Sequence, residues 1–278
     1  MALSKLQKQM KAIADAIREK CGETCTIKCC DFPNKIKAMS MPPKTESGMY
    51  VLSYDSGTNK PVSVELWGRS YTGELASEGK LDLVIYGEGI TAIGASSCND
   101  SSVTRVILPT TLETIGASAF ASCNSLSKVE LSDGTQRLPD GVTAIPASCF
   151  SNCKFTTLEL PDGIESIGNK AFQNSTYTIS KLPLSLKTVG QYAFSKIGSA
   201  TFTEIPAGVT TLDLRCFEGN GGLTSITFKG KPNSINSYAF STCSNITVIN
   251  CPWAEGAVAN APWGASNAVI NYNYTEEE

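Results

Sequence analysis

The sequence predicts an α+β solenoid made of a short N-terminal helix, about seven stacked repeats of 22–23 residues, and β-rich end caps. Three observations support this fold class. An aromatic position recurs at a nearly constant spacing, an aliphatic residue lies at a fixed distance before it, and a proline recurs at a second fixed distance. Such a period is typical of proteins that stack similar units, because each unit buries its apolar side against the next.

The repeats align on an aromatic residue that follows Ala or Cys. Counted from Cys98, which takes this anchor position in a degenerate first unit, successive anchors are 22, 30, 22, 22, 23 and 23 residues apart. An aliphatic residue stands five positions before every anchor, and a proline stands eleven positions before five of the seven. We expect the aromatic anchors to fill the centre of the stack as its structural core: Phe120, Phe150, Phe172, Phe194, Phe217 and Phe240.

Each unit is expected to open with a short strand whose alternate side chains point inward. A proline then ends the strand, because it has no N–H to donate to a ladder. A turn follows, and the aliphatic residue before the anchor starts the return. The clearest predicted strands are Val103–Leu108, Leu126–Leu131, Phe155–Leu160 and Leu223–Phe228.

The repeat sequence resembles a known family. The phrases VTRVILPTTLETIGASAFASCNSL and FTTLELPDGIESIGNKAFQNS resemble the BspA-type, or treponemal-type, leucine-rich repeat, and the resemblance covers about residues 81–250. Departures are Cys98 at the first anchor, Cys149 and Cys216 in place of an Ala, and about eight extra residues at Ser132–Pro139. Proteins with such repeats are surface adhesins and interaction modules, so the resemblance implies binding.

Composition excludes several classes of function. The chain has 278 residues and no histidine, which removes the commonest general base and metal ligand. Its net charge of −3 provides no basic stripe for nucleic acid, and no apolar run approaches the roughly 20 residues of a membrane span. We expect no catalytic residues, no enzyme activity, no cofactor, no nucleic-acid partner and no membrane insertion.

Both ends of the chain resemble tail proteins of phages that infect Gram-positive bacteria. The opening LSKLQKQMKAIADAIREKCGETCTIKCCDFPNKIKAM and the ending CPWAEGAVANAPWGASNAVINYNY carry this resemblance. It implies a virion tail protein that attaches to other tail proteins through its N-terminus and acts outside the cell. The N-terminus has no secretory h-region, so we expect synthesis in the bacterial cytoplasm and release by lysis.

The N-terminal segment, residues 1–39, contains an apolar seam suited to oligomerisation or docking. Its residues follow a 3-4-3-4 spacing: Leu3, Leu6, Met10, Ile13 and Ile17. This is the a/d pattern of a coiled coil, although fewer than three heptads are present. One reading is a helix packed on its own chain, and the other is a helix that oligomerises or docks on a tail. The phage resemblance, rather than the heptad, favours a trimer.

Caps are expected on both sides of the repeats. Residues 40–80 provide a linker and an N-terminal β cap, in which Met49–Tyr54 and Pro61–Leu66 form a hairpin. The repeats occupy residues 81–250, and residues 251–278 form a C-terminal cap with an acidic tail. Trp253 and Trp263 are expected to pack on the last coil, and the alternative is a site where they stack on a carbohydrate.

The eleven cysteines fall into two groups. Those within the repeats are read as small buried apolar side chains. The group Cys21, Cys25, Cys29 and Cys30 has the spacing C-x₃-C-x₃-C-C without a second pair, which is unlike a structural zinc site. Trimer-axis disulfides or unreactive thiols are preferred there, and no metal site is assigned.

A ligand is expected on the outward positions of the strands, which repeat along the stack. The candidate binding residues are Ile85, Arg105, Ile107, Lys128, Glu130, Thr157, Glu159, Lys181, Glu204 and Thr227. The alternative for each of them is an ordinary solvated position. Ile179 and Phe202 would also fall on this face, although the register slips there.

Three functions are compatible with these features of the sequence. The first is a phage-tail or tail-like protein that binds a bacterial surface protein or polysaccharide. The second is a purely structural tail or baseplate protein, and the third is a BspA-like bacterial surface adhesin. Staining of host cells by the purified protein separates the first from the second.

Overall fold

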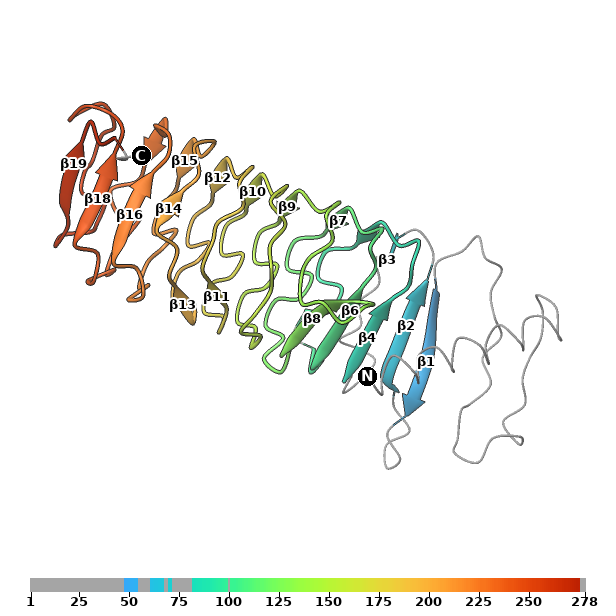
Figure 1. The fold of residues 1–278 in the computed structure, drawn as a ribbon. Helices are drawn as coiled ribbons and strands as arrows, with labels where there is room; N and C mark the ends of the chain where they lie inside the picture. Colours follow the sequence, from blue (N-terminus) through green and yellow to red (C-terminus); the bar gives the residue numbers. More distant parts are fainter. Residues whose placement is uncertain (1–47, 55–60, 68–69, 72–81, 100, 276–278) are drawn as a thin grey trace, which may run out of the picture.

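The structure is a computed structural model that describes residues 48–54, 61–67, 70–71, 82–99 and 101–275. These residues form an elongated stack of coils, with strand β1 (Gly48–Tyr54) at one end and strand β19 (Val269–Tyr272) at the other (Figure 1). No helix occurs among them. The solenoid prediction is therefore confirmed, whereas its α component is wrong for the described part of the chain. The expected helix with Leu3, Leu6, Met10, Ile13 and Ile17 lies outside the described residues.

One side of the stack, called here the long-strand face, carries most of the four-residue strands. Its first sheet has the order β1-β2-β4-β6-β8, and only the β1–β2 pair is antiparallel. Its last sheet has the order β14-β16-β18-β19, all parallel. Between them lies a two-stranded sheet, β11-β13. The strands of this face other than β1 and β19 are β2 (Pro61–Trp67), β4 (Leu83–Tyr86), β6 (Arg105–Leu108), β8 (Lys128–Leu131), β11 (Thr178–Ile179), β13 (Ser199–Ala200), β14 (Glu204–Ile205), β16 (Ser225–Phe228) and β18 (Val248–Cys251).

A second side consists of two-residue parallel strands, one from each coil. They form the sheets β3-β5-β7 and β9-β10-β12-β15-β17. These strands are β3 (Ser70–Tyr71), β5 (Ala92–Ile93), β7 (Thr114–Ile115), β9 (Ala144–Ile145), β10 (Ser166–Ile167), β12 (Thr188–Val189), β15 (Thr211–Leu212) and β17 (Ser234–Ile235). A glycine often follows the strand because the coils approach closely: a Cβ on Gly116 would lie 2.2 Å from the backbone nitrogen of Ala95.

The third side holds the anchor residues, and its backbone explains the absence of a helix. Residues two positions before and after several anchors adopt left-handed φ angles, such as 56° at Ser118 and 57° at Ser122. Left-handed residues interrupt any right-handed helix. Backbone bonds run between coils instead, and Phe120 N–H donates to the Cys149 carbonyl at 3.0 Å.

The aromatic anchors form a continuous column along the axis of the stack. All six are fully buried, and neighbouring ring centroids lie 5.3 to 5.6 Å apart in stacked geometry. Cys98 is also fully buried in the first anchor position. The predicted core residues Phe120, Phe150, Phe172, Phe194, Phe217 and Phe240 are thus confirmed.

The stack extends by one coil beyond the predicted repeats at each end. Strand β3 pairs with β5 before the first predicted unit, and Phe240 N–H donates to the carbonyl of Trp263, which takes an anchor position after the last. The solenoid therefore has about nine turns rather than seven. The expected N-terminal hairpin is present as β1 and β2.

The C-terminal tryptophans close the core, as predicted. Trp263 is fully buried and Trp253 is 6% exposed. Both rings contact Phe228 edge-on, with centroid distances of 5.9 Å and 5.1 Å. Buried rings present no face to a sugar, so the alternative of carbohydrate stacking at these residues is wrong.

The described cysteines are buried thiols. Seven of them are free, and burial raises the pKa of Cys98 to about 12 and that of Cys243 to about 11. The described residues contain no cluster of three or more side chains suited to hold a metal ion. The denser group Cys21, Cys25, Cys29 and Cys30 lies outside the described residues.

Candidate ligand-binding face

The long-strand face does not present all of its predicted residues to solvent. Lys128, Thr157, Glu159, Lys181 and Glu204 are exposed, and Ile85, Arg105 and Thr227 are partly exposed. Ile107 and Glu130 differ from the expectation, since they are only 2% and 4% exposed. Alternation along a strand gives the direction of a side chain but not whether its neighbours cover it.

Neighbouring strands explain the burial of these two residues. Ile107 lies in register between Ile85 and Glu130 on adjacent parallel strands. Arg105 forms an ion pair with Glu130, and its Nε donates to Glu130 Oε1 at 2.6 Å. Ile107 is therefore covered by its neighbours, and the charges of Arg105 and Glu130 are paired with each other and not presented to a ligand.

The extra residues Ser132–Pro139 form a small turn and then pair with the next coil, so most of the insert does not project from the long-strand face. Leu131 N–H donates to the Thr135 carbonyl, which closes a small turn. The chain then pairs with the next coil, where Leu138 N–H donates to the Glu159 carbonyl and Glu159 N–H donates to the Gln136 carbonyl. The only part of the insert that resembles a free loop is its tip, where Asp133 and Gly134 are exposed.

A change of strand register interrupts the face in its second half. In regular coils, the inward residue stands three positions before the end-of-strand position, as Ile226 does before Lys229. In the two coils where Pro183 and Pro206 take the end-of-strand position, the buried residue stands four positions before it instead. These residues are Ile179 and Phe202, each 2% exposed. The slip expected at these two residues is therefore real, and both side chains point inward.

The register change leaves an open cleft between two sheets. Strands β13 and β14 lie on the same coil, but β13 pairs with β11 of the preceding coil and β14 pairs with β16 of the following one. No ladder therefore joins β14 to the preceding coil. A cavity of about 390 Å³ occupies this gap. We call it the register cleft, and it is lined by Ser180, Lys181, Leu182, Leu184, Phe202, Thr203, Glu204, Pro206, Ala207, Gly208 and Lys229.

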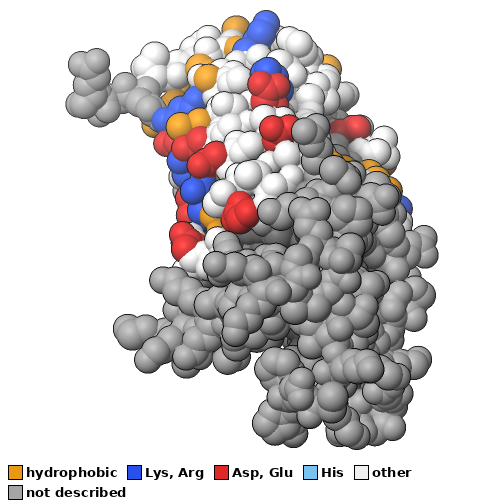
Figure 2. Space-filling view, turned by 90° about the vertical axis from the view of Figure 1, so that its right-hand side faces the viewer, with side chains coloured by type: hydrophobic (Ala, Val, Ile, Leu, Met, Phe, Trp, Pro, Cys, Tyr) orange, Lys and Arg blue, Asp and Glu red, His pale blue; other side chains and the backbone are white. Residues whose placement is uncertain are grey.

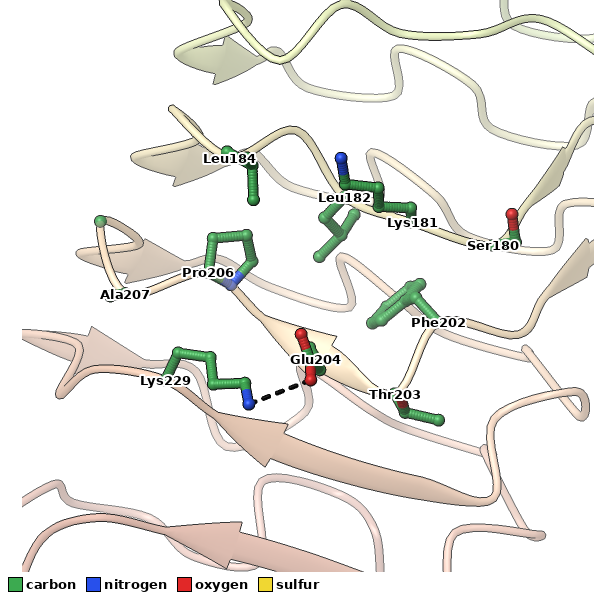
Figure 3. Close-up of a pocket in the computed structure, with 11 residues that line it drawn as sticks. Ser180, Lys181, Leu182, Leu184, Phe202, Thr203, Glu204, Pro206, Ala207 and Lys229 are labelled. Atoms are coloured by element: carbon green, nitrogen blue, oxygen red, sulfur yellow. Dashed lines mark ion pairs between the residues drawn. The ribbon is translucent and has the colours of Figure 1, made fainter. Parts of the chain in front are cut away.

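The register cleft has an apolar floor and a charged rim (Figure 3). Leu182 and Phe202 extend toward each other at its base, and Pro206 lies beside them. Leu184 stands at the entrance and is 62% exposed, which makes it one of the most exposed large apolar side chains described. Apolar groups gathered in a concave site, with a few polar groups around them, are typical of binding sites.

Two ion pairs occupy the rim. Lys229 Nζ lies 3.0 Å from Glu204 Oε1, and Lys181 Nζ lies 3.0 Å from Asp162 Oδ1. The hydrogen bond from Lys181 lowers the pKa of Asp162 below its ordinary value. Both pairs join neighbouring coils, and acidic and basic side chains are also interspersed on the described surface in Figure 2. The rim thus carries both signs of charge, and a ligand of high net charge of either sign is not favoured.

The family of the chain follows from its repeats. The family model of the BspA type leucine rich repeat region matches six copies, over residues 91–142 and 143–255, which is more than half of the chain. The chain belongs to the BspA-type leucine-rich-repeat family. The sequence resemblance over the repeats is confirmed, and membership accounts for the stacked anchors and the parallel coils. A comparison with curated proteins found no match.

Solved structures similar to this BspA-type chain are bacterial leucine-rich-repeat proteins. One from Bacteroides ovatus is 17% identical, with coverage of 78% of this chain and 73% of the other and a TM-score of 0.32. One from Eubacterium ventriosum is 18% identical, with coverages of 82% and 78% and a TM-score of 0.37. A leucine rich cell surface protein from Faecalibacterium prausnitzii is 18% identical, with coverages of 75% and 58% and a TM-score of 0.33.

Sequence reasoning placed three residues of the register cleft on the candidate face: Lys181, Glu204 and, with a slip of register, Phe202. It missed the floor residue Leu182 and the entrance residue Leu184. A signal was present in the sequence: Ser180 and Thr203 stand where the other strands have an aliphatic residue. A polar residue at an inward position indicates a shift of register.

Among the described residues, no helix is both long and apolar enough to span a bilayer.

Proposed function

We propose that this BspA-type chain is a recognition module that binds a protein on the surface of a bacterium through the register cleft. One observation carries this proposal: the cleft is a solvent-open gap of about 390 Å³ with an apolar floor on the long-strand face. A ligand side chain that enters it removes apolar area from water, at about 25 cal/mol for each Å². The ligand backbone would lie across the strands, as in other extended solenoid surfaces.

A protein ligand is preferred over a polysaccharide because of the chemistry of the cleft. Its floor consists of Leu182, Phe202 and Pro206, and its rim charges are already paired with each other. An aliphatic or aromatic side chain matches such a floor. A sugar would have to place hydroxyl groups against it without hydrogen-bond partners, which costs free energy. Polysaccharide binding is the second candidate, supported by exposed polar residues such as Thr157 and Glu159.

We further propose that the module belongs to the tail of a phage or a phage-tail-like particle. The resemblance of both chain ends to phage tail proteins supports this assignment. The N-terminal seam would attach the chain to other tail proteins or join copies of it, with a trimer favoured. A BspA-like adhesin on a bacterial surface is the alternative from the same family, and a purely structural tail protein is the alternative without a ligand.

The cleft proposal is tested by a matched pair of substitutions. Thr203→Arg places a long side chain at the exposed mouth of the cleft, and Thr143→Arg places the same side chain at an exposed position directly before β9. Labelled full-length protein is titrated onto a panel of bacterial strains. We expect Thr203→Arg to weaken binding at least tenfold on the strains that the parent protein stains, and Thr143→Arg to leave it unchanged. Equal binding by both variants would refute the role of the cleft.

Two further treatments separate the alternatives. Protease treatment of the cells should abolish binding to a surface protein but preserve binding to a polysaccharide. A protein that stains no strain but is present in purified tails would support the structural role. For the N-terminal seam, the double variant Leu6→Asp, Ile13→Asp should lower the solution mass of the full chain if the seam joins copies.

A further inference from the structure

Within the described part of the chain, the last strand of the solenoid, β19, has one edge that pairs with no other strand. It pairs with β18 on one side only, in the register Val248↔Val269 to Cys251↔Tyr272. Val269 N–H donates to the Thr247 carbonyl at 2.8 Å, so the backbone groups of Val269 face β18. Because these directions alternate along a strand, the N–H and C=O groups of Ile270 and Tyr272 face away from the sheet.

The side chains of β19 are only half covered. Ile270 and Tyr272 continue the inward columns of Ile249 and Cys251, yet both are partly exposed, because none of the described coils packs beyond them. Val269 is 63% exposed, the highest value among the large apolar side chains described. The tryptophans close the centre of the stack, so the uncovered apolar area is confined to the end of the long-strand face.

The edge also lacks the features that keep strands apart. Proteins protect an edge strand with lysines, prolines, bulges or a covering segment. No charged residue or proline occurs between Val269 and Tyr274, and no described strand pairs with the outer edge of β19. An uncharged, unpaired edge is suited to pairing with another strand.

We propose that β19 pairs antiparallel with β19 of a second copy of this chain, with the two-fold axis at Asn271. In this register Ile270 of one copy lies opposite Tyr272 of the other, and the reverse. The backbone groups of these residues face away from β18, so each opposite pair exchanges two backbone hydrogen bonds. The two Asn271 side chains then lie opposite each other. The pairing is isologous, so it joins two copies through the same edge and does not continue into a filament.

Asn271 is suited to this position by its existing contacts. Its Nδ2 donates to Asn250 Oδ1 at 2.9 Å, and Asn250 Nδ2 donates to Thr227 Oγ1 at 3.1 Å, which forms an amide ladder across three strands. An amide can both donate and accept, so the ladder can continue into the second copy.

This proposal does not depend on the proposed ligand or on the tail assignment, and a charge exchange at Asn271 tests it. Asn271→Lys or Asn271→Asp places like charges directly opposite each other in the pair, which is destabilising. A mixture of the two variants places opposite charges there. The solution mass of the full chain is measured by light scattering over a concentration series for the parent, each variant and the mixture.

We expect the mass of the parent to approach twice that of either variant as the concentration rises, and the mixture to recover the parental mass. Ser244→Lys, an exposed change of the same charge in a turn outside β19, should keep the parental mass. Circular dichroism shows whether each variant is folded. Equal masses for the parent and both variants would overturn the pairing. A loss in both variants without recovery in the mixture would overturn the register at Asn271.

Discussion

Replacement of Phe172 by Ala tests the inside-outside assignment of the repeats at the middle of the stack. Phe172 is fully buried and stacks between Phe150 and Phe194, at centroid distances of 5.5 Å and 5.3 Å. The ring of Tyr177 lies 4.8 Å from it. The substitution therefore removes one ring from a continuous column and leaves a hole that coils on both sides hold open.

The magnitude follows from burial and from the lost stacking. Truncation of a buried Phe to Ala costs about 3–5 kcal/mol, and the upper part of this range applies when the site cannot collapse. Each stacked ring pair adds about 0.5–1.5 kcal/mol beyond its buried area. Backbone bonds between coils fix the walls of this hole, since Phe172 N–H donates to the Ala193 carbonyl at 2.8 Å. We expect a loss of about 5 kcal/mol, and a smaller loss for Phe172→Leu.

The assay is urea unfolding followed by two signals. Circular dichroism reports the strands of the whole stack, while tryptophan fluorescence is weighted toward the last coil, which holds two of the three tryptophans. A weakened central coil should uncouple the two halves, because each coil contacts only its neighbours. The two signals should therefore separate in Phe172→Ala and coincide in the parent.

The control is Glu159→Ala, which removes an exposed side chain from the same coil as Phe172. Surface substitutions of this kind change stability by less than about 0.5 kcal/mol. If Phe172→Ala and Glu159→Ala lowered the urea midpoint equally, the stacked column would not carry the stability that we assign to it.

Three further predictions concern the buried thiols and the close contact between coils. A disulfide reagent should modify at most four of the eleven cysteines in the native protein, because seven are buried and free. In urea it should modify all eleven. Rapid modification of more than four cysteines in the native protein would contradict their burial. Burial raises the pKa of Cys98 to about 12, so the folded state keeps a proton that the unfolded state releases above pH 9, and stability should fall as the pH rises from about 9 to 12. Cys98→Ala should reduce that slope by about 1.4 kcal/mol for each pH unit, and an unchanged slope would show that this thiol does not contribute. Gly116→Ala should destabilise the protein by about 1–3 kcal/mol because its Cβ would meet the neighbouring backbone, whereas Gly163→Ala, whose nearest contact is 3.9 Å away, should be neutral or slightly stabilising in a thermal melt.

The repeat columns of the sequence were sufficient to locate the core. Apolar residues at fixed spacing must be buried somewhere, and a period near 22 residues leaves stacking as the way to bury all of them at once. The same reasoning placed Trp253 and Trp263 against the last coil. It did not predict the backbone conformation of the return segment, because left-handed residues such as Ser118, Lys170 and Tyr192 carry no sequence signature of that conformation.

The candidate site was predictable only in part, because it depends on relations between coils. The sequence by itself determined the anchors, three of the four clearest strands and the outward direction of residues such as Lys181 and Glu204. The fourth predicted strand, Phe155–Leu160, is wrong, since this segment forms only an isolated bridge at Glu159. Only the tertiary structure decided that Ile107 and Glu130 are covered, that a two-strand register change opens the cleft, and that β19 ends the sheet with a free edge. The physical reason is that a side-chain pattern fixes what each coil buries, whereas the ladder between two coils depends on the lengths and registers of both.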